Sequence, residues 1–165
     1  MTDAFDDLLA ANRESLEGFA LGDLTGTPRR KLAVLTCVDT RIDPYLVLGL
    51  GPGDAKILRN AGARVTDDVV RSLALVVAAL GVERVAVIAH TDCAVAKGTD
   101  DELRELVAGA TGSDTSSFEP LAVDDQEATV SADVQRLRDD PLLPDGLAYG
   151  GFIYDVKTGA LRPVD

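Results

Sequence analysis

The residues best suited to chemistry in this sequence stand in two short segments. The first is CVDTR at residues 37–41, and the second is HTDC at residues 90–93. Together they contain both cysteines and the only histidine of the 165-residue chain. Zinc prefers thiolate, imidazole and carboxylate ligands in a four-coordinate shell. The two segments therefore predict a zinc site, with four candidate ligands: Cys37, Asp39, His90 and Cys93.

The spacing within each segment allows the side chains to converge. Cys37 and Asp39 are two positions apart, so in an extended chain they lie on the same side of the backbone. His90 and Cys93 are three positions apart and converge if the chain turns or begins a helix after His90. Asp39 on the metal would close the shell, whereas a water there would leave a catalytic position. Arg41 can hold Asp39 off the metal through two hydrogen bonds to its carboxylate.

Each segment alone has an ordinary structural explanation. A lone histidine is commonly structural, and a cysteine such as Cys93 is often a small buried apolar residue. The pair Asp39 and Arg41 could be a surface ion pair. In a reducing cytosol a disulfide between the two cysteines is improbable. The occurrence of all these residues together favours metal binding.

The elements predicted around these segments alternate between strands and helices. Apolar runs predict strands at residues 31–36, 56–59, 84–89 and 150–156. Turns rich in glycine separate helical patterns at residues 2–19, 42–50, 66–80, 100–108 and 124–137. Thr66 and the aspartates after it are expected to cap their helix. Both candidate segments follow a strand, and in open α/β sheets sites form beyond the carboxyl ends of strands.

This order predicts an α/β fold in one domain, with a mostly parallel central sheet of four to five strands flanked by helices. We expect residues 1–28 to form an N-terminal helix and connector, and residues 29–165 to form the α/β core. The apolar positions of the first helix suit packing on its own domain or on a partner subunit.

Composition narrows the classes of partner. The formal net charge is −12 and no basic stripe offsets it, which argues against nucleic acid as a partner. No apolar run approaches the roughly 20 residues that span a bilayer, so we expect no membrane partner. The first residues are acidic, unlike those of a signal peptide. We therefore expect a cytoplasmic protein.

Several further motifs resemble those of one family, the β-class carbonic anhydrases, and most closely its short bacterial and archaeal members. Besides CVDTR and HTDC, the resemblance rests on residues 59–62 (RNAG), 66–68 (TDD), 71–73 (RSL) and 151–156 (GFIYDV). It extends over nearly the whole chain. It implies a zinc enzyme that reversibly hydrates carbon dioxide to bicarbonate and a proton, with zinc-bound hydroxide as the nucleophile.

The resemblance also assigns roles to residues. It implies that Cys37, His90 and Cys93 bind zinc, and that Asp39 either ligates the metal or pairs with Arg41 in an active state. Gly62 and Ala94 are expected to line the substrate pocket. The resemblance further implies a homodimer or a higher homo-oligomer, with the N-terminal helix packed on the partner. Because no second histidine is available as a proton shuttle, we expect turnover to depend on buffer or on carboxylates such as Asp67 or Asp68.

Ala94 departs from the family pattern, which has glycine after the second cysteine. Alanine keeps the backbone N–H but adds a methyl group, and it disfavours a positive φ by roughly 1 kcal/mol. Lys97 also lies close to the site in sequence. Two alternatives therefore stay open: a catalytically silent zinc protein with Asp39 locked on the metal, and a hydrolase of carbonyl sulfide or carbon disulfide using the same site.

Overall fold

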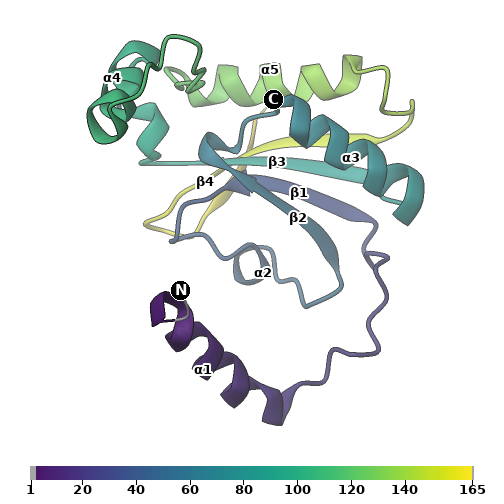
Figure 1. The fold of residues 1–165 in the computed structure, drawn as a ribbon. Coiled ribbons are helices and arrows are strands. Elements are labelled where there is room, and N and C mark those ends of the chain that lie inside the picture. The colour runs from purple at the N-terminus through teal and green to yellow at the C-terminus, as the bar shows by residue number, and fades with distance from the viewer. Residues whose placement is uncertain (1–2, 165) are drawn as a thin grey trace.

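A five-stranded sheet organises the chain in the computed structural model, which describes residues 3–164 (Figure 1). The sheet order is β2-β1-β3-β4-β5, in which the first four strands are parallel and β5 is antiparallel to β4. In chain order the strands are β1 (Leu32–Cys37), β2 (Ala55–Asn60), β3 (Arg84–His90), β4 (Ala148–Tyr154) and β5 (Leu161–Val164). The mostly parallel sheet is confirmed, and β5 gives it an antiparallel edge.

Five α-helices accompany the sheet within the described residues: α1 (Asp6–Ser15), α2 (Pro44–Val47), α3 (Asp67–Leu80), α4 (Asp100–Thr111) and α5 (Gln126–Asp139). Four short 3-10 turns are η1 (Asp3–Phe5), η2 (Leu16–Gly18), η3 (Ala61–Ala63) and η4 (Ala94–Ala96). Thr2, where the first predicted helix begins, lies outside the described residues.

Two local predictions need correction. The helix predicted over residues 42–50 is only the four residues of α2, because Asp43 caps it, Pro44 starts it and Gly49 takes a left-handed φ of 59° soon after its end. Thr66 occupies the N-cap position of α3, but its side chain makes no capping hydrogen bond. The two aspartates of the first turn still favour that helix end through the helix dipole.

Hydrophobic residues bury both faces of the sheet. On one face lie α3 and α5, with α5 over β3 and β4 (Figure 1), and this cluster includes Leu35, Leu73 and Leu137, each 0% exposed. On the opposite face Val34 and Ile88 join Ile42, together with both cysteines. Because successive residues of a strand point to opposite faces, β1 contributes to both clusters.

The N-terminal helix α1 lies apart from the sheet, below α2 in Figure 1. None of its ten residues is buried, and Phe5, Leu8 and Leu16 are each about 60% exposed. Within residues 3–164, no helix combines the length and apolar character needed to cross a membrane.

The strand order creates a natural site at the carboxyl ends of β1 and β3. From β1 the chain moves to β2 on one side, and it then returns to β3 on the other side of β1. At such a reversal the connections leave in opposite directions, so they open a crevice between the two strand ends. Cys37 is the last residue of β1 and His90 the last residue of β3, so both lie at this crevice.

Candidate metal centre

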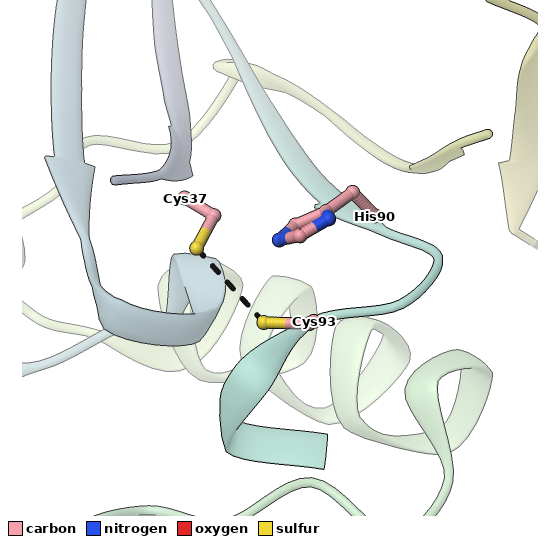
Figure 2. A group of neighbouring side chains, drawn as sticks. All are labelled: Cys37, His90 and Cys93. Carbon is pink, nitrogen blue, oxygen red and sulfur yellow. Dashed lines mark hydrogen bonds between the residues drawn. The ribbon is translucent and has the colours of Figure 1, made fainter. Parts of the chain in front are cut away.

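Three side chains converge at the crevice: Cys37, His90 and Cys93. Their ligand atoms all lie within 4.8 Å of one another, and all three residues are buried. Figure 2 shows the two sulfur atoms pointing toward each other, with the imidazole of His90 directed into the same space. The structure therefore brings together three of the four candidate ligands that the sequence predicts.

A turn after β3 lets His90 and Cys93 converge. Asp92 takes a left-handed φ of 56°, a conformation that aspartate tolerates better than most residues. The chain then enters η4 directly after Cys93. Either a turn or the start of a helix after His90 would bring the two side chains together, and the structure has a turn.

The geometry of the three donors fits zinc. Two thiolates at about 2.3 Å from a tetrahedral zinc lie about 3.8 Å apart. The sulfur atoms of Cys37 and Cys93 are 3.9 Å apart, and both thiols are free. His90 Nε2 is the one buried side-chain nitrogen or oxygen among residues 3–164 without a hydrogen-bond partner. Its other nitrogen, Nδ1, lies 2.9 Å from the Thr91 carbonyl oxygen, where it can donate and leave the Nε2 lone pair facing the sulfurs.

Burial acts on the ionisation of these groups. It lowers the pKa of His90 and so favours the neutral imidazole that binds metals. It also raises the pKa of Cys93, an effect that the neighbouring Cys37 increases. A divalent cation reverses this penalty, because it stabilises thiolate charge. The site is thus better suited to a cation than to free thiols.

Asp39 lies beside this cluster and is held by Arg41. Arg41 Nε and Nη2 donate to the two carboxylate oxygens of Asp39 at 2.9 and 2.7 Å, and the Arg41 backbone N–H donates at 2.9 Å. These hydrogen bonds hold the pKa of Asp39 well below its usual range, so the carboxyl stays ionised. Asp39 Oδ2 is 3.9 Å from His90 Nε2. The carboxylate is therefore engaged with Arg41 while remaining next to the metal ligands.

The guanidinium of Arg41 is shared with Asp92. Arg41 Nη1 lies 2.7 Å from Asp92 Oδ2, and Nη2 donates to the Asp92 carbonyl at 3.0 Å. Lys97 Nζ lies 2.7 Å from the other carboxylate oxygen of Asp92. The hydrogen bonds from Lys97 and Arg41 lower the pKa of Asp92 to about 2. Lys97, noted in the sequence for its closeness to the site, thus pairs with Asp92.

Gly62 and Ala94, the residues expected to line the substrate pocket, differ in position. Gly62 is buried, and its backbone N–H donates to Cys37 Sγ at 3.4 Å. Ala94 is exposed at the start of η4. It is not among the residues with positive φ, so its methyl group causes no left-handed strain. The backbone penalty considered for Ala94 does not arise.

Substituting Gly62 with alanine should destabilise the fold more than an equivalent change elsewhere. Gly62 has a φ of 78°, and a Cβ there would lie 2.8 Å from Cγ2 of the stiff Val95 side chain. Left-handed backbone costs alanine roughly 1 kcal/mol, and overpacking adds about 1–3 kcal/mol. The matched control is Gly81→Ala, whose φ is 67° with no atom within 4 Å of the added Cβ. Urea denaturation of both variants measures the difference, and equal losses would contradict steric crowding at Gly62.

Three supporting contacts were not predicted from the sequence. Arg59 donates to the carbonyl oxygens of Cys37 and Asp39 at 2.8 and 2.7 Å, so it fixes the backbone of the first segment. Gln126 donates to the His90 carbonyl from α5. Arg64 forms a buried ion pair with Asp133, which is 5% exposed. The burial of Asp133 was indicated by the sequence, because Asp133 shares one helical face with Val130, Val134 and Leu137.

The carboxylates named as candidate proton acceptors are both paired. Asp67 forms an ion pair with Arg136 of α5, and Asp68 pairs with Arg71 at 3.0 Å. Asp68 also lines a cavity of about 500 Å³ beside β2 and the start of α3. Neither contact tests the dependence of turnover on buffer, which stays a prediction.

The chain is similar to known proteins in both sequence and structure. Residues 32–161 match the family model described as carbonic anhydrase. The beta-carbonic anhydrase 1 of Mycobacterium tuberculosis is 36% identical over 159 residues, covering 96% of each chain. A carbon disulfide hydrolase of an Acidianus species is 33% identical over 171 residues, covering 89% of this chain and 84% of the relative.

Among solved structures, a carbonic anhydrase from Streptococcus mutans superposes with a TM-score of 0.93 at 38% identity. The match covers 98% of this chain and 97% of the other. The fold, the family model and the relatives agree with the resemblance carried by the sequence motifs. The chain belongs to the β-class carbonic anhydrases.

Proposed function

We propose that this protein reversibly hydrates carbon dioxide to bicarbonate and a proton, with Zn²⁺ held by Cys37, His90 and Cys93. The observation that carries the proposal is the convergence of these three ligand atoms within 4.8 Å, next to a carboxylate engaged by an arginine. Membership of the family and the carbonic anhydrase relatives support the same activity.

The residues around the centre have separate tasks in this proposal. Zinc, when bound, lowers the pKa of a water ligand to about 7, a value known from a carbonic anhydrase, and so supplies a hydroxide nucleophile. Asp39 accepts a hydrogen bond at the open position and orients the nucleophile. Arg41 keeps Asp39 ionised and off the metal. Gly62 and Ala94 line the substrate pocket in this proposal; the Ala94 N–H meets the substrate, while the Gly62 N–H stays on the Cys37 sulfur.

Asp39 can also act as a fourth metal ligand in a resting state. Release from Arg41 would free its carboxylate, and a closed four-coordinate shell leaves no position for water. Arg41 pairs with both Asp39 and Asp92, which supports the active arrangement, in which Asp39 is off the metal. A protein locked in the closed arrangement is the catalytically silent alternative.

Hydrolysis of carbon disulfide or carbonyl sulfide is the second candidate activity. Proteins described as carbon disulfide hydrolases, from Acidianus and Saccharolobus, are 33% and 32% identical to this chain. The same nucleophile can attack the carbon of either kind of substrate. The preference between carbon dioxide and its sulfur analogues therefore depends on access to the metal centre rather than on the metal ligands.

Stopped-flow assays of the zinc-loaded protein test these candidates. We expect carbon dioxide hydration to rise with pH through an apparent pKa near 7, with about one zinc per chain. Carbon disulfide, assayed on the same preparation, should be turned over more slowly. A zinc-loaded protein inactive toward carbon dioxide at every pH would refute the proposal, and activity toward carbon disulfide alone would establish the second candidate.

We also propose that residues 1–28 form an N-terminal helix and connector that pack on a partner subunit, beside the α/β core of residues 29–165. The protein is then a homodimer or a higher homo-oligomer. The exposed apolar side chains of this N-terminal segment, including Phe5, Leu8 and Phe19, support the proposal. Light scattering on the purified protein measures the mass in solution.

A further inference from the structure

Helix α5 carries one carboxylate on its buried face. The buried residues of this helix are Val130, Asp133, Val134 and Leu137. Asp133 Oδ2 lies 2.8 Å from Nε of Arg64, whose side chain is only 19% exposed. The ion pair joins α5 to the segment that follows η3, a region 69 residues earlier in the chain.

Both partners make additional hydrogen bonds. Asp133 Oδ2 accepts the backbone N–H of Val65 at 3.1 Å, and Arg64 Nη1 donates to the Leu121 carbonyl at 3.0 Å. A buried ion pair is a weak source of stability, because desolvation of the two charges offsets their attraction. Apolar residues of similar volume often stabilise a fold equally well. The charged pair is therefore better explained by the geometry that it imposes.

Arg64 restrains a loop with an unfavourable backbone conformation. Gly62 and Ala63 are consecutive left-handed residues, with φ of 78° and 58°. Asn60 spans them, because its side chain accepts the Arg64 N–H at 2.9 Å and donates to the Arg64 carbonyl at 2.7 Å. A non-glycine residue in this conformation persists only where its surroundings enforce it. Fixing Arg64 therefore fixes the whole turn.

The loop lies against a metal ligand. The Gly62 N–H reaches Cys37 Sγ at 3.4 Å, and Val95, two residues after Cys93, lies against Gly62 where a Cβ would stand. A hydrogen bond to a thiolate stabilises its charge and orients it toward a cation. The position of this N–H depends on the turn that Arg64 anchors.

We propose that Arg64 and Asp133 are positioning residues of the metal centre: their ion pair holds the Gly62 N–H on the Cys37 sulfur. The proposal rests on the zinc site proposed above, but not on its reaction. Neither residue is a ligand. They act by restraining the loop that covers one ligand, so their loss should loosen the loop and speed metal release.

The first test compares two carboxylates of the same helix in zinc-loaded protein. Asp133→Asn removes the charge that restrains Arg64, whereas Glu127→Gln removes the partner of Arg162, an ion pair between α5 and β5. Loss of a residue that orients a metal ligand typically weakens metal binding about 10- to 100-fold. We expect zinc transfer to a chromogenic chelator to become at least about tenfold faster in D133N, and to stay within about twofold of the parent in E127Q.

A double variant separates positioning from stability. Arg64→Met with Asp133→Leu removes both charges, so no unpaired charge remains, and only the Val65 N–H and the Leu121 carbonyl lose a partner. We expect a smaller loss of melting temperature than in D133N, faster zinc release, and faster amide hydrogen exchange in residues 60–65. The cobalt-substituted form should show a shifted thiolate-to-cobalt absorption band. Arg64→Lys, which keeps the charge without the forked geometry, should give an intermediate release rate.

The outcomes are decisive in both directions. Parental zinc release, exchange and cobalt absorption in the double variant would overturn the proposal. Faster release in the double variant and in D133N, with a parental E127Q, would support it. Because these measurements report metal retention and loop order, they are independent of carbon dioxide turnover. An inactive parent that binds zinc would refute the proposed function and leave this test intact.

Discussion

Replacing His90 with alanine is expected to abolish zinc retention and activity together. His90 is 1% exposed and is the only histidine of the sequence, so no other imidazole can take its place. A metal that binds only the folded state at 1,000 times its dissociation constant contributes about 4 kcal/mol of stability. Its loss should lower the melting temperature by roughly 10 °C. Metal analysis and calorimetry measure the two effects.

The control for this prediction is a large buried residue outside the metal centre. Leu137 is 0% exposed on the buried face of α5, in the other hydrophobic cluster. Leu137→Ala should lose about 2–5 kcal/mol of stability because it leaves a cavity, yet it should keep about one zinc per chain. A His90→Ala protein that still retained one zinc after dialysis would mean that the three side chains do not form the site.

Replacing Arg41 with alanine is expected to keep zinc and lose most of the activity. The variant lacks the two side-chain hydrogen bonds to the Asp39 carboxylate and keeps only the one from the backbone N–H, so Asp39 can reach the metal and displace water. Loss of an oriented hydrogen-bonding or proton-accepting group typically costs 10²–10⁴ in rate. We expect kcat/KM for carbon dioxide hydration to fall by about 10²-fold, measured by stopped flow at full zinc occupancy.

Lys97→Ala provides the matched control for Arg41. It removes a positive charge from the same group of ion pairs, but it contacts Asp92 rather than Asp39. We expect the rate to stay within about threefold of the parent, because a half-exposed ion pair contributes little. If both variants lose activity equally, the net charge around the site matters rather than the release of Asp39. A parental rate in Arg41→Ala would exclude the mechanism altogether.

Residue type and position directly after predicted parallel strands indicated that the metal ligands converge. Cys37 and His90 end adjacent parallel strands, and β2 and β3 lie on opposite sides of β1, so the connections leave in opposite directions and open a crevice at those ends. The pairing of Asp39 with Arg41 was also predictable, because it is a contact between residues two positions apart. Patterns that are local, or that follow from parallel topology, could thus be read before the fold was known.

The contacts that hold the site in shape were not predictable in the same way. Arg59, Gln126 and Asp133 each act on a segment far away in sequence, and their partners are set by loop conformations. At the left-handed turn, the Asp92 carboxylate pairs with Arg41, 51 residues earlier, and with Lys97. The spacing of residues in a single sequence does not indicate which distant segments such side chains contact. The apolar face of α5 around Asp133 indicated a buried partner without identifying it.

The exposure of α1 has a consequence for how the protein behaves on dilution. A helix of ten residues with no buried side chain is only marginally stable in water. In the homo-oligomer proposed above, α1 draws its order from contacts with another copy of the chain. By mass action, the ordered fraction of α1 would then follow the protein concentration. Helical content measured at nanomolar concentration would report on assembly rather than on the fold of the individual subunit.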